Sequence, residues 1–318
     1  MTSSACRRVV TVALLLAHPA VAAGAPGWRL LALMPLDERT TLAAFVDERT
    51  GVRLGGPWVR YTLDGGRTWL DGASPDPARH ALEVLPDGFA WHAGVLSVGR
   101  SFSYGRTWYQ GGNFGGGDPQ PAVFLSFADE NRGLIAARAR LGLTEDGGLE
   151  WTSLPLPGWA EGVAAVSLSL APPSPGAAPP AMVARHTRRA VVGRVLDTAG
   201  RIWVTRDGGA TWSFAESPIA GRRFRVAGGV ATAALRFTAA GDGVLAALVE
   251  EDGRERLRVF RSTPDEAGWT EERFPLVEEP GALYLSPDGR LLTWKRIGRN
   301  ELRLFVREGT TAAGAPSP

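Results

Sequence analysis

The sequence predicts an all-β fold: a β-propeller of four-stranded antiparallel blades arranged around a central axis. Three observations support this. An eight-residue segment recurs along the chain, six pairs of short apolar runs are joined by turn-forming residues, and no sustained helical pattern of apolar residues is present. Six hairpins predict six blades, and five or seven blades remain compatible with the pattern.

The recurring segment ends in a tryptophan and carries an aspartate and two glycines at its centre. It is most complete at 205–212. The copy at 62–69 matches it at six of eight positions and the copy at 144–151 at five, while 101–108 has a serine in place of the aspartate. A fifth, degenerate copy is expected at 262–269, with its aspartate one position out of register. We call these segments the repeat turns.

The residue types of the repeat turns indicate a structural role. Aspartate and threonine side chains accept hydrogen bonds from backbone N–H groups just ahead of them, which closes a tight turn. Glycine supplies positive φ at little cost. The late threonine is expected to start a strand, and the tryptophan to be buried. Because the turn already uses the carboxylate, this role is favoured over catalysis or calcium binding. The residues assigned to it are Asp64, Gly66, Trp69, Gly105, Trp108, Asp146, Gly148, Trp151, Asp207, Gly209 and Trp212.

The pattern S/T-x-D-x-G-x-T-W resembles the Asp-box, or BNR repeat. It occurs in a β-propeller superfamily that includes sialidases, other glycoside hydrolases, sortilin-type receptors and photosystem II assembly factors. The resemblance covers roughly residues 40–275. It implies a propeller whose boxes are structural and lie away from the ligand face, so a function does not follow from the box itself.

Taken in order, the chain begins with a segment, residues 1–22, that is typical of a secretory signal peptide. Arg7 and Arg8 precede a short apolar run, and Ala20-Val21-Ala22 is an A-x-A cleavage site. A retained membrane anchor is the alternative, but the run is short for a bilayer span. Cys6 lies inside this segment, so the exported protein is expected to contain no thiol. Removing the segment leaves 33 basic and 33 acidic residues, which gives no support for a nucleic-acid partner.

The hairpins then follow one another along a single domain, expected at 27–308. Residues 27–35 form an apolar run that either supplies a strand of the first blade or completes the last. The paired strands are expected at 41–46 with a run through 61, 89–92 with 95–98, 134–137 with 141–143, 191–196 with 202–204, 244–249 with 257–260, and 291–295 with 302–306.

Spacing between the repeat turns supports one blade for each. Their aspartate positions are separated by 39, 43, 61 and 58 residues, and the shorter spacings fit a four-stranded blade. The Pro-rich stretch 171–180 accounts for one long spacing, since it is unsuited to a central strand. The Gly/Ala/Pro-rich tail at 309–318 is expected to be disordered.

A sialidase function can be tested against the residues that the resemblance implies. Sialidases have an F/Y-R-I/L-P motif for the first of three carboxylate-binding arginines, and a tyrosine–glutamate pair as nucleophile. Trp28-Arg29-Leu30-Leu31 and Phe224-Arg225-Val226-Ala227 both lack the proline. Tyr109 and Tyr284 remain candidate nucleophiles, whereas the other two tyrosines lie beside or within repeat turns. The missing motif disfavours sialidase activity.

Other catalytic chemistry has less support. His80, His92 and His186 lack metal-ligand spacing, and no nucleophile elbow, P-loop or dinucleotide-binding fingerprint is present. No metal, cofactor or catalytic residue is therefore expected. The carboxylate pairs Glu250-Glu251 and Glu278-Glu279 are expected in solvated turns. Eleven tryptophans raise the question of sugar binding, and those whose placement stays open are Trp58, Trp91, Trp159 and Trp203.

The sequence favours an exported binding or assembly module without catalysis, periplasmic or extracellular, with a protein or glycan partner on one face. No membrane span is expected after signal removal. The alternative is a carbohydrate-active protein, either a sialidase-like glycoside hydrolase or a lectin. Three arginines and two carboxylates in one central pocket would indicate the enzyme, and a shallow face of mixed polar and apolar residues would indicate the binder.

Overall fold

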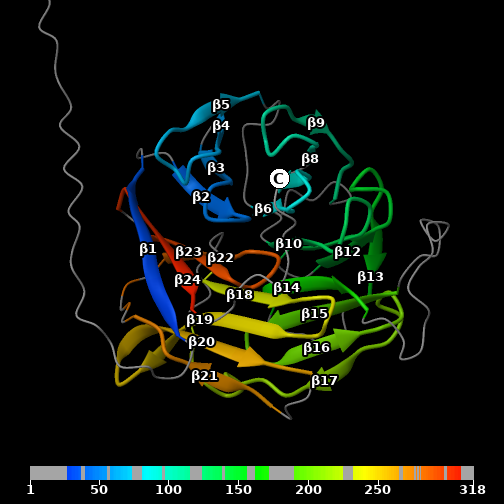
Figure 1. Cartoon of the computed structure of the whole chain (residues 1–318). Helices are drawn as coiled ribbons and strands as arrows, with labels where there is room; N and C mark the ends of the chain where they lie inside the picture. Colours follow the sequence, from blue (N-terminus) through cyan, green and yellow to red (C-terminus); the bar gives the residue numbers. More distant parts are fainter. Residues whose placement is uncertain are drawn as a thin grey trace, which may run out of the picture.

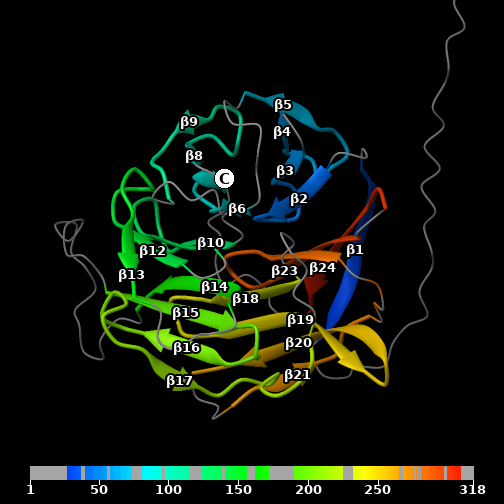
Figure 2. The same ribbon diagram turned by 180° about the vertical axis from the view of Figure 1, so that it is seen from behind.

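The computed structural model describes residues 27–36, 40–55, 58–73, 81–94, 97–114, 124–137, 140–155, 162–171, 190–224, 232–264, 268–275, 277, 279, 281–296 and 299–308. Every regular element in these ranges is a β-strand, and the strands form six four-stranded antiparallel sheets. The sheets surround a common axis as the blades of a propeller (Figures 1 and 2). The predicted fold class and the six blades are confirmed.

Each blade runs from an inner strand at the axis to an outer strand at the perimeter. Blade 1 contains β2 (Thr40–Phe45), β3 (Gly51–Gly55), β4 (Trp58–Thr62) and β5 (Leu70–Gly72), and blade 2 contains β6 (Ala81–Val84), β7 (Ala90–Ala93), β8 (Val98–Ser101) and β9 (Tyr109–Gln110). Blade 3 contains β10 (Phe124–Phe127), β11 (Gly133–Ala137), β12 (Arg140–Thr144) and β13 (Thr152–Leu154), and blade 4 contains β14 (Val163–Leu170), β15 (Val191–Asp197), β16 (Ile202–Thr205) and β17 (Ser213–Ala215). Blade 5 contains β18 (Ala233–Phe237), β19 (Gly243–Glu251), β20 (Arg254–Ser262) and β21 (Thr270–Glu272), and blade 6 contains β22 (Gly281–Leu285), β23 (Leu291–Arg296), β24 (Glu301–Arg307) and β1 (Trp28–Pro35).

The ring is closed by joining the two ends of the chain in blade 6. β1 pairs antiparallel with β24, from Trp28 opposite Arg307 to Pro35 opposite Glu301. The blue strand therefore lies beside the red one in Figure 1. Trp28 also reaches blade 5, where its indole Nε1–H donates to the Glu272 carboxylate at 2.7 Å. Of the two predicted placements, residues 27–35 complete the last blade.

The core lies between neighbouring blades, because both faces of each sheet are covered by the next sheet in the ring. Inner and second strands are therefore almost fully buried, as the apolar run of β11 is. Between blades 4 and 5, Leu196, Ile202, Leu235 and Leu245 form part of one cluster. Burying each such side chain contributes roughly 1.5–3 kcal/mol.

The repeat turns connect the third and fourth strands of blades 1 to 4, at the end of the ring where the first and second strands are also joined. Backbone hydrogen bonds tie the two kinds of turn together. Gly65 N–H donates to Arg49 C=O at 2.8 Å, and Gly147 N–H donates to Asn131 C=O at 2.7 Å. We call this end of the ring the repeat face.

Three predicted strand boundaries are wrong. The third strand of blade 2, expected at 95–98, is β8 at Val98–Ser101, which runs directly into its repeat turn; residues 95 and 96 lie outside the described residues. Glu250 and Glu251 belong to β19 rather than to a solvated turn, since the β19–β20 hairpin turns only at Asp252-Gly253. The strand after each repeat turn begins after the tryptophan, not at the threonine.

Several predicted features lie outside the described residues: the segment 1–22, Cys6, the aspartate of the fifth repeat turn, the Pro-rich stretch from 172 onward and the tail 309–318. In the parts of the chain that the structure does describe, no helix is long and apolar enough to cross a membrane.

Candidate functional site

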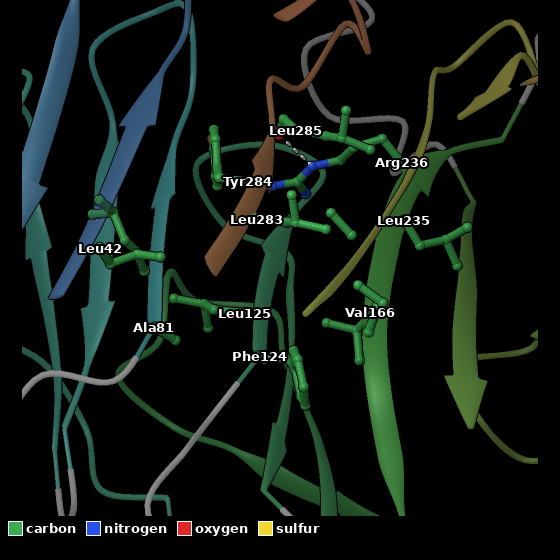
Figure 3. A pocket seen from close by; sticks show the side chains of 14 residues that line it. Leu42, Ala81, Phe124, Leu125, Val166, Leu235, Arg236, Leu283, Tyr284 and Leu285 are labelled. Atoms are coloured by element: carbon green, nitrogen blue, oxygen red, sulfur yellow. Dashed lines mark hydrogen bonds between the residues drawn. The ribbon is translucent and has the colours of Figure 1, made fainter. Parts of the chain in front are cut away.

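The central channel is the first place where a propeller could hold a ligand. All six inner strands contribute to its lining, and most of the side chains are aliphatic, including Leu42, Leu125, Val166 and Leu283. Figure 3 shows them converging from different blades, with Arg236 and Tyr284 among them. The channel contains a cavity of about 50 Å³.

A buried polar cluster crosses this channel. Arg236 on β18 pairs with the Glu83 carboxylate on β6, donates from Nη1 to Ser126 Oγ on β10 at 2.8 Å, and donates from Nε to Leu285 C=O on β22 at 3.0 Å. Ser126 Oγ also accepts the backbone N–H of Leu168 on β14 at 3.0 Å. One guanidinium thus links inner strands from four blades, and the serine extends the link to a fifth.

Burial shapes the electrostatics of this cluster. Removal from water raises the pKa of Glu83 to about 7, although the charge of Arg236 and its hydrogen bond oppose the shift. Burial likewise raises the pKa of Tyr284, whose ring lies 5.3 Å from the Arg236 guanidinium carbon. The Tyr284 hydroxyl donates to Val84 C=O at 3.3 Å. Burial therefore favours the protonated form of both side chains.

The geometry of the channel does not suit glycoside hydrolysis. The cavity of about 50 Å³ has room for roughly three or four water molecules, and its lining is mostly aliphatic. Among the described lining residues, Arg236 is the one arginine, and it is already committed to Glu83. Tyr284 lies near Glu83, as a nucleophile pair would, but both side chains are buried and the tyrosine hydroxyl is bonded to Val84 C=O.

The repeat turns form the second place that the sequence singled out. In blade 4, Thr205 Oγ1 donates to Asp207 at 2.8 Å and accepts Gly209 N–H at 2.8 Å. Asp207 accepts Thr211 N–H at 2.9 Å. Blade 1 repeats this network, and the hydroxyl and N–H of Thr68 lower the pKa of Asp64 to about 2. The aspartate oxygens are directed at their own turns.

The second repeat turn reaches the same geometry without its aspartate. Ser103 Oγ accepts Thr107 N–H at 3.2 Å, and Ser101 Oγ accepts Gly105 N–H at 3.0 Å. A hydroxyl therefore replaces one of the carboxylate bonds. Tyr104 takes the place of the first glycine and adopts a φ of 51°, which a non-glycine residue reaches only at a cost.

The tryptophans of the repeat turns are less buried than predicted. Trp108 is buried, but Trp69, Trp151 and Trp212 are half-buried. The reason is their position: the outer strand that follows each of them lies at the perimeter, so one edge of the indole stays near solvent. They still pack between blades, as Trp151 does against the cluster that blades 2 and 3 share.

The remaining tryptophans do not form an exposed platform in the described part of the chain. Trp91 is buried and stacks on Phe127. Trp58 is half-buried with arginine guanidinium groups near its ring. Trp203 is half-buried beneath Phe214, with ring centroids 3.8 Å apart. Trp159 lies outside the described residues. The described tryptophans therefore do not support the sugar binding that the number of tryptophans suggested.

The other candidate residues are dispersed. His92 is buried against Trp108, whereas His80 and His186 lie outside the described residues. Arg29 pairs with Glu308 at the surface, and Tyr109 is exposed on β9. No group of three or more histidine, cysteine, aspartate or glutamate side chains suited to a metal ion occurs in the described ranges. The structure does not bring these residues together.

Exposed apolar side chains gather on the perimeter strands and on the repeat turns, a feature that the sequence reading missed. They are Leu30, Leu33, Leu63, Leu70, Phe102, Tyr109, Leu149 and Phe214. The outer strands are only two or three residues long in blades 1 to 5. Strands this short leave little periodicity from which to recognise an exposed face.

Comparisons with known proteins identify the fold alone. No family model matches the chain, and no curated protein matches it either. Among solved structures, the WD40 repeats of RRP9 are 10% identical, with 89% of this chain and 98% of that chain covered and a TM-score of 0.55. An ancestral GH74 enzyme is 11% identical, with 90% and 40% covered and a TM-score of 0.51. YCF48 bound to D1 peptide is 13% identical, with 94% and 99% covered and a TM-score of 0.49. At these identities the likeness establishes a β-propeller and no more.

Proposed function

We propose that this chain is a non-catalytic binding or assembly module that presents the outside of a propeller to a protein partner. The filled channel is the observation that carries the proposal. Arg236, Glu83 and the aliphatic side chains occupy much of the axis and leave a cavity of about 50 Å³, so we place the binding surface on the outside of the ring. That surface offers exposed aromatic and aliphatic side chains, which are typical of protein interfaces.

The repeat turns fit this proposal as structural Asp-boxes. Their aspartate, threonine and glycine groups are occupied by bonds within each turn, and the turns fasten the outer strands to the repeat face. We assign these aspartate, threonine and glycine groups no ligand and no catalysis. Binding then depends on residues that differ from blade to blade.

Export completes the proposal. The positive start, the apolar run and the A-x-A site of residues 1–22 support secretion to the periplasm or the exterior, with 27–308 as the propeller domain. The partner is accordingly an envelope or extracellular protein.

The test combines partner capture with a glycan array. The purified protein is immobilised and exposed to an envelope fraction of the source organism, and each captured protein is then purified and titrated. A saturable one-to-one interaction with one protein, together with no glycan binding, is the expected result. Binding to glycans alone would replace the module with a lectin, and release of sugar from any glycan would establish an enzyme.

A further inference from the structure

One arginine of blade 2 has no hydrogen-bond or ion-pair partner among the described residues. Arg100 lies on β8, half-buried, with its guanidinium carbon 5.2 Å from the centre of the Phe102 ring. Its Nε is buried without an acceptor. Four other arginines in the described ranges share a buried Nε without an acceptor, but three of them form ion pairs and the fourth, Arg53, lies over two tryptophan rings. They are Arg53, Arg256, Arg261 and Arg307.

Aromatic rings surround this cation. Arg100 is opposite Trp91 of β7 and Tyr109 of β9, so the three side chains share one face of the sheet. Phe102 lies 5.5 Å from Tyr109 and 5.4 Å from Phe89 between ring centroids. We call these five residues the blade 2 aromatic surface. Phe102 and Tyr109 are 49% and 52% exposed, so these two rings open to solvent, whereas Trp91 is buried.

No ion pair joins Arg100 to a described carboxylate of the neighbouring blade. The repeat turn of blade 3 lies against this surface, since Trp91 Nε1–H donates to Gly147 C=O at 2.9 Å. The carboxylate of that turn, Asp146, already accepts the hydroxyl of Thr144 and the N–H of Glu150. A charge partly withdrawn from water without a counter-ion is unfavourable for folding. An anion supplied from outside would offset that loss.

We propose that the blade 2 aromatic surface binds an extended segment of the partner protein. An aspartate or glutamate of that segment lies on Arg100, and an adjacent apolar side chain lies on Phe102 and Tyr109. The proposal rests on the proposed function and gives it a location and a partner chemistry. Arginine binds carboxylates in a bidentate geometry, and arginine, tyrosine and other aromatic residues supply most interface anchors.

A peptide suits this surface better than an acidic sugar. A sugar needs several hydrogen-bonding groups around its ring hydroxyls. Of the five side chains, only Arg100 and the Tyr109 hydroxyl are available, because Trp91 donates to Gly147 and the other two are phenyl rings. A carboxylate flanked by apolar side chains needs no more than these.

The experiment selects peptides from a random display library on the full-length protein, and measures each one against two variants. Arg100→Met removes the charge and keeps the stem. Arg106→Met is the matched control, since Arg106 is an exposed arginine of the same blade that lies over Tyr61 of blade 1 instead. We expect selected peptides to carry an acidic residue beside an apolar one. They should bind Arg100→Met at least about tenfold more weakly and Arg106→Met as well as wild type.

A second pair of measurements keeps the result independent of folding. Arg100→Met should melt no lower than wild type, because an unpaired charge is removed. Tyr109→Ala, at a half-exposed position, should also weaken the peptides. Replacing the peptide's acidic residue with its amide should abolish the difference between wild type and Arg100→Met.

Four outcomes overturn the proposal. If the selected peptides bind Arg100→Met and wild type equally, or if only peptides without an acidic residue are selected, the site is wrong and the module binds elsewhere. If acidic glycans bind in an Arg100-dependent way and peptides do not, the surface recognises sugar. If no peptide is selected while a captured partner still binds Arg100→Met, the proposed site is wrong but the proposed function stands. If no partner is captured either, the proposed function is wrong as well.

Discussion

At the scale of single residues, the repeat turns show that geometry matters more than identity. Ser103 and Asp146 occupy equivalent positions, and each accepts the backbone N–H four residues ahead. The Asp146 carboxylate accepts more hydrogen bonds than the Ser103 hydroxyl does, so we expect the aspartate to stabilise its turn more. The hydrogen bonds were predictable from residue types, but the ability of serine to replace the aspartate was not, because it depends on a distance of 3.2 Å.

Removing the carboxylate of the third repeat turn should destabilise the protein. Asp146→Ala leaves the N–H groups of Leu149 and Glu150 without their acceptor. Loss of a turn or cap bond of this kind costs about 0.5–2 kcal/mol. Urea unfolding measures the change in free energy. An unchanged midpoint, together with lost partner binding, would show that this aspartate belongs to a binding site.

The reverse substitution in blade 2 provides the control. Ser103→Asp restores the carboxylate in a turn that already has its glycine, threonine and tryptophan, so it should be neutral or stabilising by up to about 1 kcal/mol. A clear loss of stability would indicate that the turn of blade 2 differs in more than this side chain.

Stability should depend on pH through Glu83. Its pKa is about 7 in the folded protein, against an ordinary value of 4.5, because of burial. The folded state thus holds this proton more tightly than the unfolded chain does. The contribution is present in full below pH 4.5 and is lost as pH rises to about 7, with an upper limit of about 3 kcal/mol. Glu83→Gln has no such proton. As pH rises from 4.5 to about 7, the unfolding free energy of the wild type should therefore fall relative to that of Glu83→Gln. Parallel pH profiles would contradict this.

At the scale of elements, most of the blades could be read from the sequence, whereas the central cluster could not. Hairpins such as β23–β24 follow from alternating residues and local turns. Arg236 and Glu83 are 153 positions apart, and they meet only because the ring places β18 and β6 across one channel. No local pattern carries that information. Arg100 was missed for a similar reason, since its lack of a partner depends on the surroundings rather than on its own position.

Ring closure should depend on β1. A chain that starts at residue 40 lacks this strand, so the edge of β24 and the apolar side chains beneath Trp28 and Met34 become exposed. Loss of Trp28 alone is worth about 3–5 kcal/mol. We expect the shortened chain to unfold at much lower urea concentration or to aggregate. A chain that starts at residue 27 is the control. Equal midpoints for the two chains would show that blade 6 is complete without β1.

At the scale of the whole molecule, the central channel bears on the choice between a binding module and a hydrolase. The protein should release no sialic acid from a fluorogenic sialoside, because the tyrosine and the glutamate of the channel are buried and already bonded within it. Fluorescence release over several hours, with a commercial sialidase as positive control, measures this. Turnover that disappears in Tyr284→Phe or Tyr109→Phe would overturn the non-catalytic function.

The pairing of β1 with β24 has a consequence for the order of events during synthesis. β1 precedes the other five blades in the chain and β24 follows them, so blade 6 stays incomplete until those five blades have been synthesised. Meanwhile the apolar edge of β1 is open to strands of other chains. If residues 1–22 direct export, an unclosed ring is also the state suited to translocation as an extended polypeptide. Late pairing of β1 with β24 would then delay closure of the ring until the polypeptide has crossed the membrane.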